Sequence, residues 1–180
     1  SQAGAFAEGM QASKVIPTYK HFPGLGRVKD NTDTSAGVVD STTTRSADTA
    51  VSVIFGAAIA AGAPVIMVSS ATYSLIDPSA PAVFSSTIVT DMLRREMGFS
   101  GVVITDDVSA AVQVQDVSAG DRAVRAIRAG CDLVLASADP TVAADMVKAL
   151  IATARSDPAF AARVDESATR VLNLKKSLQS

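Results

Sequence analysis

The feature that most constrains the fold is a regular alternation of short apolar runs with longer segments of helical character. Strands are expected at 15–19, 65–68, 101–105 and 132–136, and a helix is expected after each of them. The run Val65-Ile66-Met67-Val68 is apolar without interruption, as is typical of a strand covered on both faces. This alternation predicts an α/β fold with a parallel sheet and helices outside it.

Apolar spacing, caps and stop signals predict the helices. They are expected over 3–14, 48–61, 86–97, 121–129, 140–154 and 158–178, with Ser85 as an N-cap and Gly130 as a stop. The segments 23–47 and 69–84 are expected to be loops. The first is rich in Gly, Thr, Ser and Asp, and it offers little apolar area that would pin it. Loops of this length are usually functional, so we expect this one to be mobile without substrate.

Four strand–helix units are half of the eight that close a TIM barrel. A parallel sheet of four strands has two open edges, and its inner Val, Ile, Met and Leu side chains need a facing layer. We therefore expect the chain to pair with the missing half of a (β/α)8 barrel on another chain, or with a second copy of itself.

Composition excludes several classes of partner. The chain has 180 residues, 48% of them hydrophobic, and its 16 basic and 18 acidic residues form no basic patch, so nucleic acid is not an expected partner. No apolar run approaches the roughly 20 residues of a membrane span.

The single cysteine, Cys131, lies in an apolar stretch and is expected to be buried. Arg94, Arg95 and Glu96 are expected to form a solvated helix face.

Polar side chains stand at the ends of two expected strands. Lys20 and His21 follow the first strand, and Asp106 and Asp107 follow the strand 101–105. Barrel enzymes keep their reactive residues at the carboxyl ends of the strands. A carboxylate there can act as nucleophile, base or acid, and a Lys-His pair can hold the hydroxyls of a polyol. The sequence therefore favours an enzyme.

The motifs around these residues resemble family 3 glycoside hydrolases. They are Lys20-His21-Phe22-Pro23-Gly24 with Gly26, then Val65-Ile66-Met67-Val68-Ser69, and Thr105-Asp106-Asp107-Val108-Ser109. The branch they resemble most is that of the β-N-acetylglucosaminidases that trim peptidoglycan fragments. The resemblance implies that residues 1–180 are the second half of the catalytic barrel, with about its last four strand–helix units.

The resemblance also implies a chemistry. The expected activity is retaining hydrolysis of terminal β-linked N-acetylglucosamine from oligosaccharides or peptidoglycan fragments, with a carbohydrate substrate and neither a metal nor another cofactor. By position Asp106 is the nucleophile, and Lys20 and His21 bind sugar hydroxyls. Asp107 is expected to order the following loop. The family suggests the cell envelope or secretion as location, and a cytoplasmic location stays open.

The acid/base is where the sequence departs from this branch, which carries Asp-Ser-His on the loop after the Lys-His motif. The same place here holds Asn31-Thr32-Asp33, and His21 is the only histidine. Asp33 is therefore the expected acid/base, with Asp30 or Asp40, or no competent acid, as alternatives. Two other functions stay open: a β-glucosidase of the same family, and a sugar-binding or structural half barrel without activity.

Overall fold

The computed structural model describes residues 2–45 and 49–178 and contains a parallel sheet of four strands. Its strands stand side by side in chain order, as β1 (Thr18–Phe22), β3 (Val65–Val68), β6 (Val102–Asp107) and β7 (Leu133–Leu135). Each neighbouring pair is parallel. The predicted parallel sheet with alternating helices is therefore confirmed.

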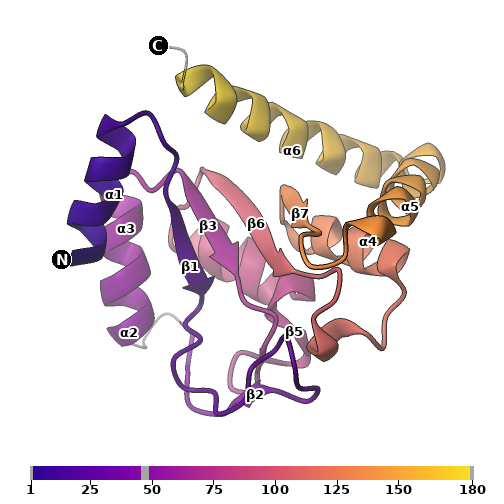
Figure 1. Ribbon diagram of the computed structural model, residues 1–180, viewed down its shortest axis with the longest axis horizontal. Helices are drawn as coiled ribbons and strands as arrows, with labels where there is room; N and C mark the ends of the chain where they lie inside the picture. Colours follow the sequence, from indigo (N-terminus) through magenta and orange to yellow (C-terminus); the bar gives the residue numbers. More distant parts are fainter. Residues whose placement is uncertain (1, 46–48, 179–180) are drawn as a thin grey trace.

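Helices follow each strand of the main sheet, and Figure 1 shows α2 and α3 to the left of β1, α4 and α5 to the right of β7, and α6 above the strands. A further helix, α1, precedes β1. The segments α2, η1 and α3 run end to end after β1, although the expected start of this helix at Asp48 lies outside the described residues. The helices are α1 (Gln2–Ala12), α2 (Thr49–Val51), η1 (Ser52–Gly56), α3 (Ala57–Ala60), η3 (Thr87–Glu96), α4 (Ala119–Ala129), α5 (Ala143–Ser156) and α6 (Pro158–Ser177), with short 3-10 turns η2 (Ala82–Phe84), η4 (Val112–Val114) and η5 (Pro140–Val142).

The helices begin and end at the signals in the sequence. Ser118 caps α4 by accepting from the amide of Asp121, and Gly130 ends that helix with φ 120°, which favours glycine. Asp157 caps α6 in the same way, one residue before Pro158. Ser85 accepts from the amide of Ile88, as predicted for an N-cap. Local chemistry therefore sets these helix ends.

The first strand is displaced from its expected position. It spans Thr18–Phe22 rather than 15–19, with Thr18 paired with Val65. Pro17 directly precedes it and has no amide to donate to a neighbouring strand, so the ladder starts after it. As a result Lys20 and His21 lie within the strand rather than after it.

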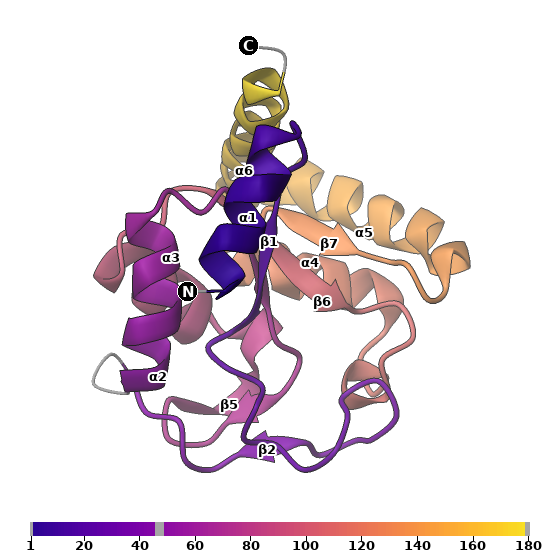
Figure 2. The ribbon, with the colours of Figure 1, turned by 60° about the vertical axis from the view of Figure 1, so that its left-hand side comes forward.

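A second, smaller sheet covers the carboxyl ends of the strands. It consists of β2 (Val39–Asp40), β4 (Thr72–Tyr73) and β5 (Asp77–Pro81), all of which were expected to be loop. Figure 2 shows β2 and β5 beyond the ends of β1 and β6. The sequence did not reveal β2 and β4 because they have only two residues each, and it did not reveal β5 because Pro78 and Pro81 argue against a strand.

The long segment after β1 is packed rather than loosely held. Val38, Asp40 and Thr43 are buried, and the Tyr73 hydroxyl donates to the carbonyl of Gly24 at 3.1 Å. The expectation that little surface pins this segment is wrong, because residues after β3 cover it. Its mobility without substrate stays a prediction, to be read from crystallographic B-factors.

The two faces of the main sheet differ in how well they are covered. Ile66 and Val103 point into the core formed with η3 and α4, and Cys131 is buried there as predicted. On the other face Met67, Ile104 and Leu133 are cross-strand neighbours and all remain partly exposed, Leu133 to 37%. This row of apolar side chains lacks a facing layer within the described residues.

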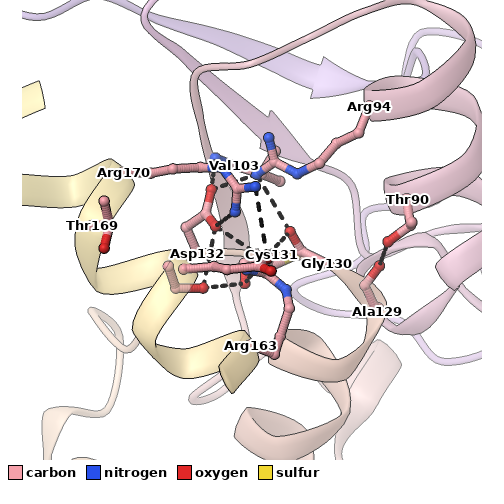
Figure 3. Close-up of polar contacts among 12 residues, drawn as sticks. Thr90, Arg94, Val103, Ala129, Gly130, Cys131, Asp132, Arg163, Thr169 and Arg170 are labelled. Atoms are coloured by element: carbon pink, nitrogen blue, oxygen red, sulfur yellow. Dashed lines mark hydrogen bonds and ion pairs between the residues drawn. The ribbon is translucent and has the colours of Figure 1, made fainter. Parts of the chain in front are cut away.

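An ion-pair cluster joins the amino ends of β6 and β7 to α6 (Figure 3). The buried carboxylate of Asp132 pairs with Arg94, with Arg163 at 2.9 Å and with Arg170 at 3.1 Å. The prediction of a solvated face is wrong for Arg94, whose side chain is only 12% exposed, whereas Arg95 is 73% exposed. The wrong prediction arose because Asp132, 38 residues further along the chain, draws Arg94 inward.

No helix in the described part of the chain is long and apolar enough to cross a membrane.

Candidate active site

Asp106 is the last but one residue of β6 and lies at the carboxyl end of the sheet. Its Oδ1 accepts from the amide of Asp107 at 2.9 Å, and its Oδ2 lies 3.9 Å from Nε2 of His21. The side chains of Asp106 and His21 are 16% and 22% exposed. Burial raises the pKa of Asp106 above its ordinary value, although the nearby His21 and Lys20 charges oppose the shift.

His21 and Lys20 reach this carboxylate from β1, across the end of the intervening strand β3. Burial lowers the pKa of His21, while the charge of Asp106 opposes that change and Lys20 adds to it. The positive charge of Lys20 therefore acts on both groups. The structure brings together Lys20, His21 and Asp106, three of the residues predicted from the sequence.

Asp33 is exposed on the segment after β1, and its charge also reaches this site. Its carbonyl accepts from the amide of Val112 at 3.2 Å, and its own amide donates to Asn31 Oδ1 at 2.9 Å. The negative charge of Asp33 adds to the rise in the pKa of Asp106 and opposes the fall in the pKa of His21. The fourth predicted residue thus stands near the other three.

The two alternative acids differ in their surroundings. Asp30 is exposed on the same segment. Asp40 is buried and accepts four hydrogen bonds from Thr42 and Thr43. Burial raises the pKa of Asp40, but these bonds lower it by more, so the net shift is downward. A carboxyl whose hydrogen bonds favour the ionised form is a poor general acid, so Asp40 is a weaker candidate than Asp33.

Asp107 orders the loops around the nucleophile position, as expected. One oxygen accepts from Ser109 and Ala110, and the other accepts from Ser137 and Ala138. Burial raises the pKa of Asp107, but these hydrogen bonds hold it well below its usual range. Its oxygens are occupied by the protein, whereas among residues 2–45 and 49–178 Asp106 finds a hydrogen-bond donor at only one oxygen.

Two buried polar residues near the site were missed by sequence reasoning. Arg122 donates to the carbonyls of Val108 and Ser109, and Gln113 bonds to the backbone of Val38. A polar residue inside the apolar stretch 108–114 was the one available signal for Gln113. Among the described residues, no three His, Cys, Asp or Glu side chains gather as metal ligands would.

Comparison with known proteins identifies the family. The model of the glycosyl hydrolase family 3 N-terminal domain matches residues 1–174. The chain belongs to glycosyl hydrolase family 3. Within this family it is 34% identical, over its whole length, to an uncharacterized secreted glycosyl hydrolase of Arthroderma benhamiae. It is 40% identical, over 74% of its length, to a β-hexosaminidase of Xylella fastidiosa.

A solved structure extends the comparison to the fold. The crystal structure of a β-N-acetylhexosaminidase from Beutenbergia cavernae matches 96% of this chain at 60% identity, with a TM-score of 0.93. The (β/α)8 barrel type predicted from the sequence is confirmed.

The chain covers 51% of that protein, 52% of the Arthroderma relative and 39% of the Xylella relative. It therefore spans about half the length, or less, of the relatives it matches. That residues 1–180 are the second half of the catalytic barrel stays a prediction.

Proposed function

We propose that this family 3 half barrel supplies the nucleophile and part of the sugar site of a retaining glycoside hydrolase. The substrate is terminal β-linked N-acetylglucosamine on an oligosaccharide or a peptidoglycan fragment. One observation carries the proposal: the Asp106 carboxylate lies at the carboxyl end of a barrel strand, 3.9 Å from His21 and within the field of Lys20. The β-hexosaminidase names of the relatives support the choice of sugar.

The reaction proceeds in two displacements. Asp106 attacks the anomeric carbon, and Asp33 donates a proton to the glycosidic oxygen as the bond to the aglycone breaks. Asp33, now ionised, takes a proton from water, and that water displaces Asp106 and releases the sugar with its configuration retained. Lys20 and His21 hold sugar hydroxyls during both steps. The scheme needs an ionised Asp106, which the positive charge of Lys20 favours.

The complete enzyme needs a closed barrel. The partly exposed row Met67, Ile104 and Leu133 requires a facing layer, and β1 and β7 are the open edges of the sheet. A cavity of about 490 Å³ lies beside β7, α5 and α6, lined mostly by apolar side chains. We propose that the first half of the barrel fills these surfaces, either on the same polypeptide or on another chain. A second copy of this chain would close the ring without the sugar contacts of the first half.

The test uses the complete polypeptide, meaning this chain together with the first half of the barrel. We expect release of nitrophenol from the N-acetyl-β-glucosaminide, a first product of β configuration by NMR, and a fluorinated sugar adduct on Asp106. Faster release from the β-glucoside would favour the alternative specificity. Binding of sugar without release from either would favour a non-catalytic module, and an adduct on Asp107 would overturn the choice of nucleophile.

A further inference from the structure

Gln113 connects two segments that are far apart in the sequence. It lies in η4, on the segment after β6, and its side chain is buried. The Val38 amide donates to Gln113 Oε1 at 2.8 Å, and Gln113 Nε2 donates to the Val38 carbonyl at 3.2 Å. One side-chain amide thus satisfies both backbone groups of a residue 75 positions away, as a neighbouring β-strand would.

The backbone of η4 holds the same segment at a second point. The Val112 amide donates to the carbonyl of Asp33 at 3.2 Å, and the Gln113 amide donates to the carbonyl of Thr32 at 3.1 Å. Thr32 and Val38 are both buried. The short stretch that begins with Asp33 is therefore fixed at both ends by one turn of 3-10 helix.

That turn is itself fixed to the strand that carries the nucleophile. Asp107 accepts from the amides of Ser109 and Ala110, and the guanidinium of Arg122 donates to the carbonyls of Val108 and Ser109. The Arg122 bonds are buried, and together with those of Asp107 they hold the path from β6 to η4 in one conformation. Asp33 follows β1 in the sequence, but these hydrogen bonds fix its position relative to β6.

We propose that Gln113 is a positioning residue that sets the place of Asp33 relative to Asp106. The inference rests on the proposed function, in which Asp33 is the acid/base and Asp106 the nucleophile. A retaining glycosidase needs these carboxyl groups roughly 5 Å apart, and a displacement of about 1 Å can cost about 100-fold in rate. The hydrogen bonds from η4 to the backbone on both sides of this stretch hold Asp33 with that precision, although its side chain is exposed.

The test is a leaving-group comparison on Gln113→Ala in the complete polypeptide. Displacing the acid slows departure of an aglycone that must be protonated, but it leaves departure of dinitrophenolate almost unchanged. We expect kcat/KM for a β-linked N-acetylglucosamine disaccharide to fall about 10- to 100-fold, within the range of general acid catalysis. For the dinitrophenyl glycoside we expect a fall below about 3-fold. An equal fall with both substrates would show a merely structural role and overturn the proposal.

Two further variants control this experiment. Gln11→Ala removes a glutamine side chain that is exposed on α1, so it should leave the ratio of the two rates unchanged. Gln113→Glu keeps the acceptor for Val38 but loses the donor, and it provides a second variant if Gln113→Ala does not fold. It should give an intermediate ratio, and a wild-type ratio would overturn the proposal.

Asp33→Asn separates failure of this inference from failure of the proposed function. Suppose that kcat/KM falls more for the disaccharide than for the dinitrophenyl glycoside in Asp33→Asn but not in Gln113→Ala. The positioning role of Gln113 is then wrong, while the assignment of Asp33 as the acid stands. If Asp33→Asn shows no such dependence, Asp33 is not the acid and both are wrong.

Discussion

Asp132 and Asp106 lie at opposite ends of the main sheet, and their carboxylates differ in how fully the protein bonds them. At the amino end, Asp132 accepts from three arginines, the amide of Val103 and the hydroxyl of Ser167. At the carboxyl end, Asp106 accepts from one backbone amide and faces His21 at 3.9 Å. A fully paired carboxylate ties elements together, whereas one with an oxygen left for substrate can react. The difference follows the general division of barrels into a stability face and a catalytic face.

The largest expected effect is on the reactive carboxylate. In the complete polypeptide, Asp106→Ala should lower kcat by on the order of 10^4-fold, because the covalent intermediate cannot form. Circular dichroism should show a folded protein. Asp91→Asn, an exposed carboxylate on η3, is the matched control and should keep activity within about 2-fold. A tenth of the parent kcat in Asp106→Ala would end the assignment.

For Asp132 we expect the reverse of Asp106: a large loss of stability and little change in kcat. Asp132→Ala leaves the guanidiniums of Arg94, Arg163 and Arg170 without their shared partner, and should lower the free energy of unfolding by about 3–5 kcal/mol. Urea denaturation measures this change. The fraction that remains folded should keep kcat within a few-fold, since the cluster lies at the other end of the strands. A full loss of kcat in folded protein would contradict the division between the two ends.

The arginines of η3 test the stability face more finely. Arg94 donates to the carbonyls of Phe99 and Gly101 as well as to Asp132, so Arg94→Ala should cost about 1–3 kcal/mol of stability. Arg95 forms an exposed pair with Asp91, and Arg95→Ala should change stability by less than about 0.5 kcal/mol. Both values come from urea denaturation of the same preparation. Equal costs would mean that the buried cluster contributes nothing beyond a surface pair.

The smallest effect concerns the pH dependence of stability. Burial raises the pKa of Asp106 in the folded protein, so ionising this group is harder in the folded than in the unfolded state. Its contribution to stability is fully present below the unfolded pKa and is lost as the pH rises through the folded pKa. Asp106→Asn should therefore be more stable than the parent at pH 7, and the difference should vanish near pH 3. A variant less stable than the parent at pH 7 would contradict the direction of the shift.

Local signals in the sequence predicted much of the architecture. Uninterrupted apolar runs marked the central strands, and Ser85 and Gly130 marked helix ends, because these effects act over a few residues. The carboxylates at the end of the strand 101–105 were found by the same local reasoning, and the reactivity of Asp106 stays a prediction. The error at β1 was also local, since Pro17 already excluded an earlier start of the ladder.

Tertiary structure decided what depends on distant partners. Arg94 has the pattern of a surface residue and is buried only because Asp132 meets it from the next strand–helix unit. The sequence of the segment after β1 predicted a loop with little to hold it, but Tyr73 and Gln113 form hydrogen bonds to its start and its middle. Asp33 lies on that same segment, from which its charge acts on Asp106. Sequence alone thus determined which groups stand at the strand ends, and long-range packing determined which of them are paired, since pairing depends on faces that meet only in the folded chain.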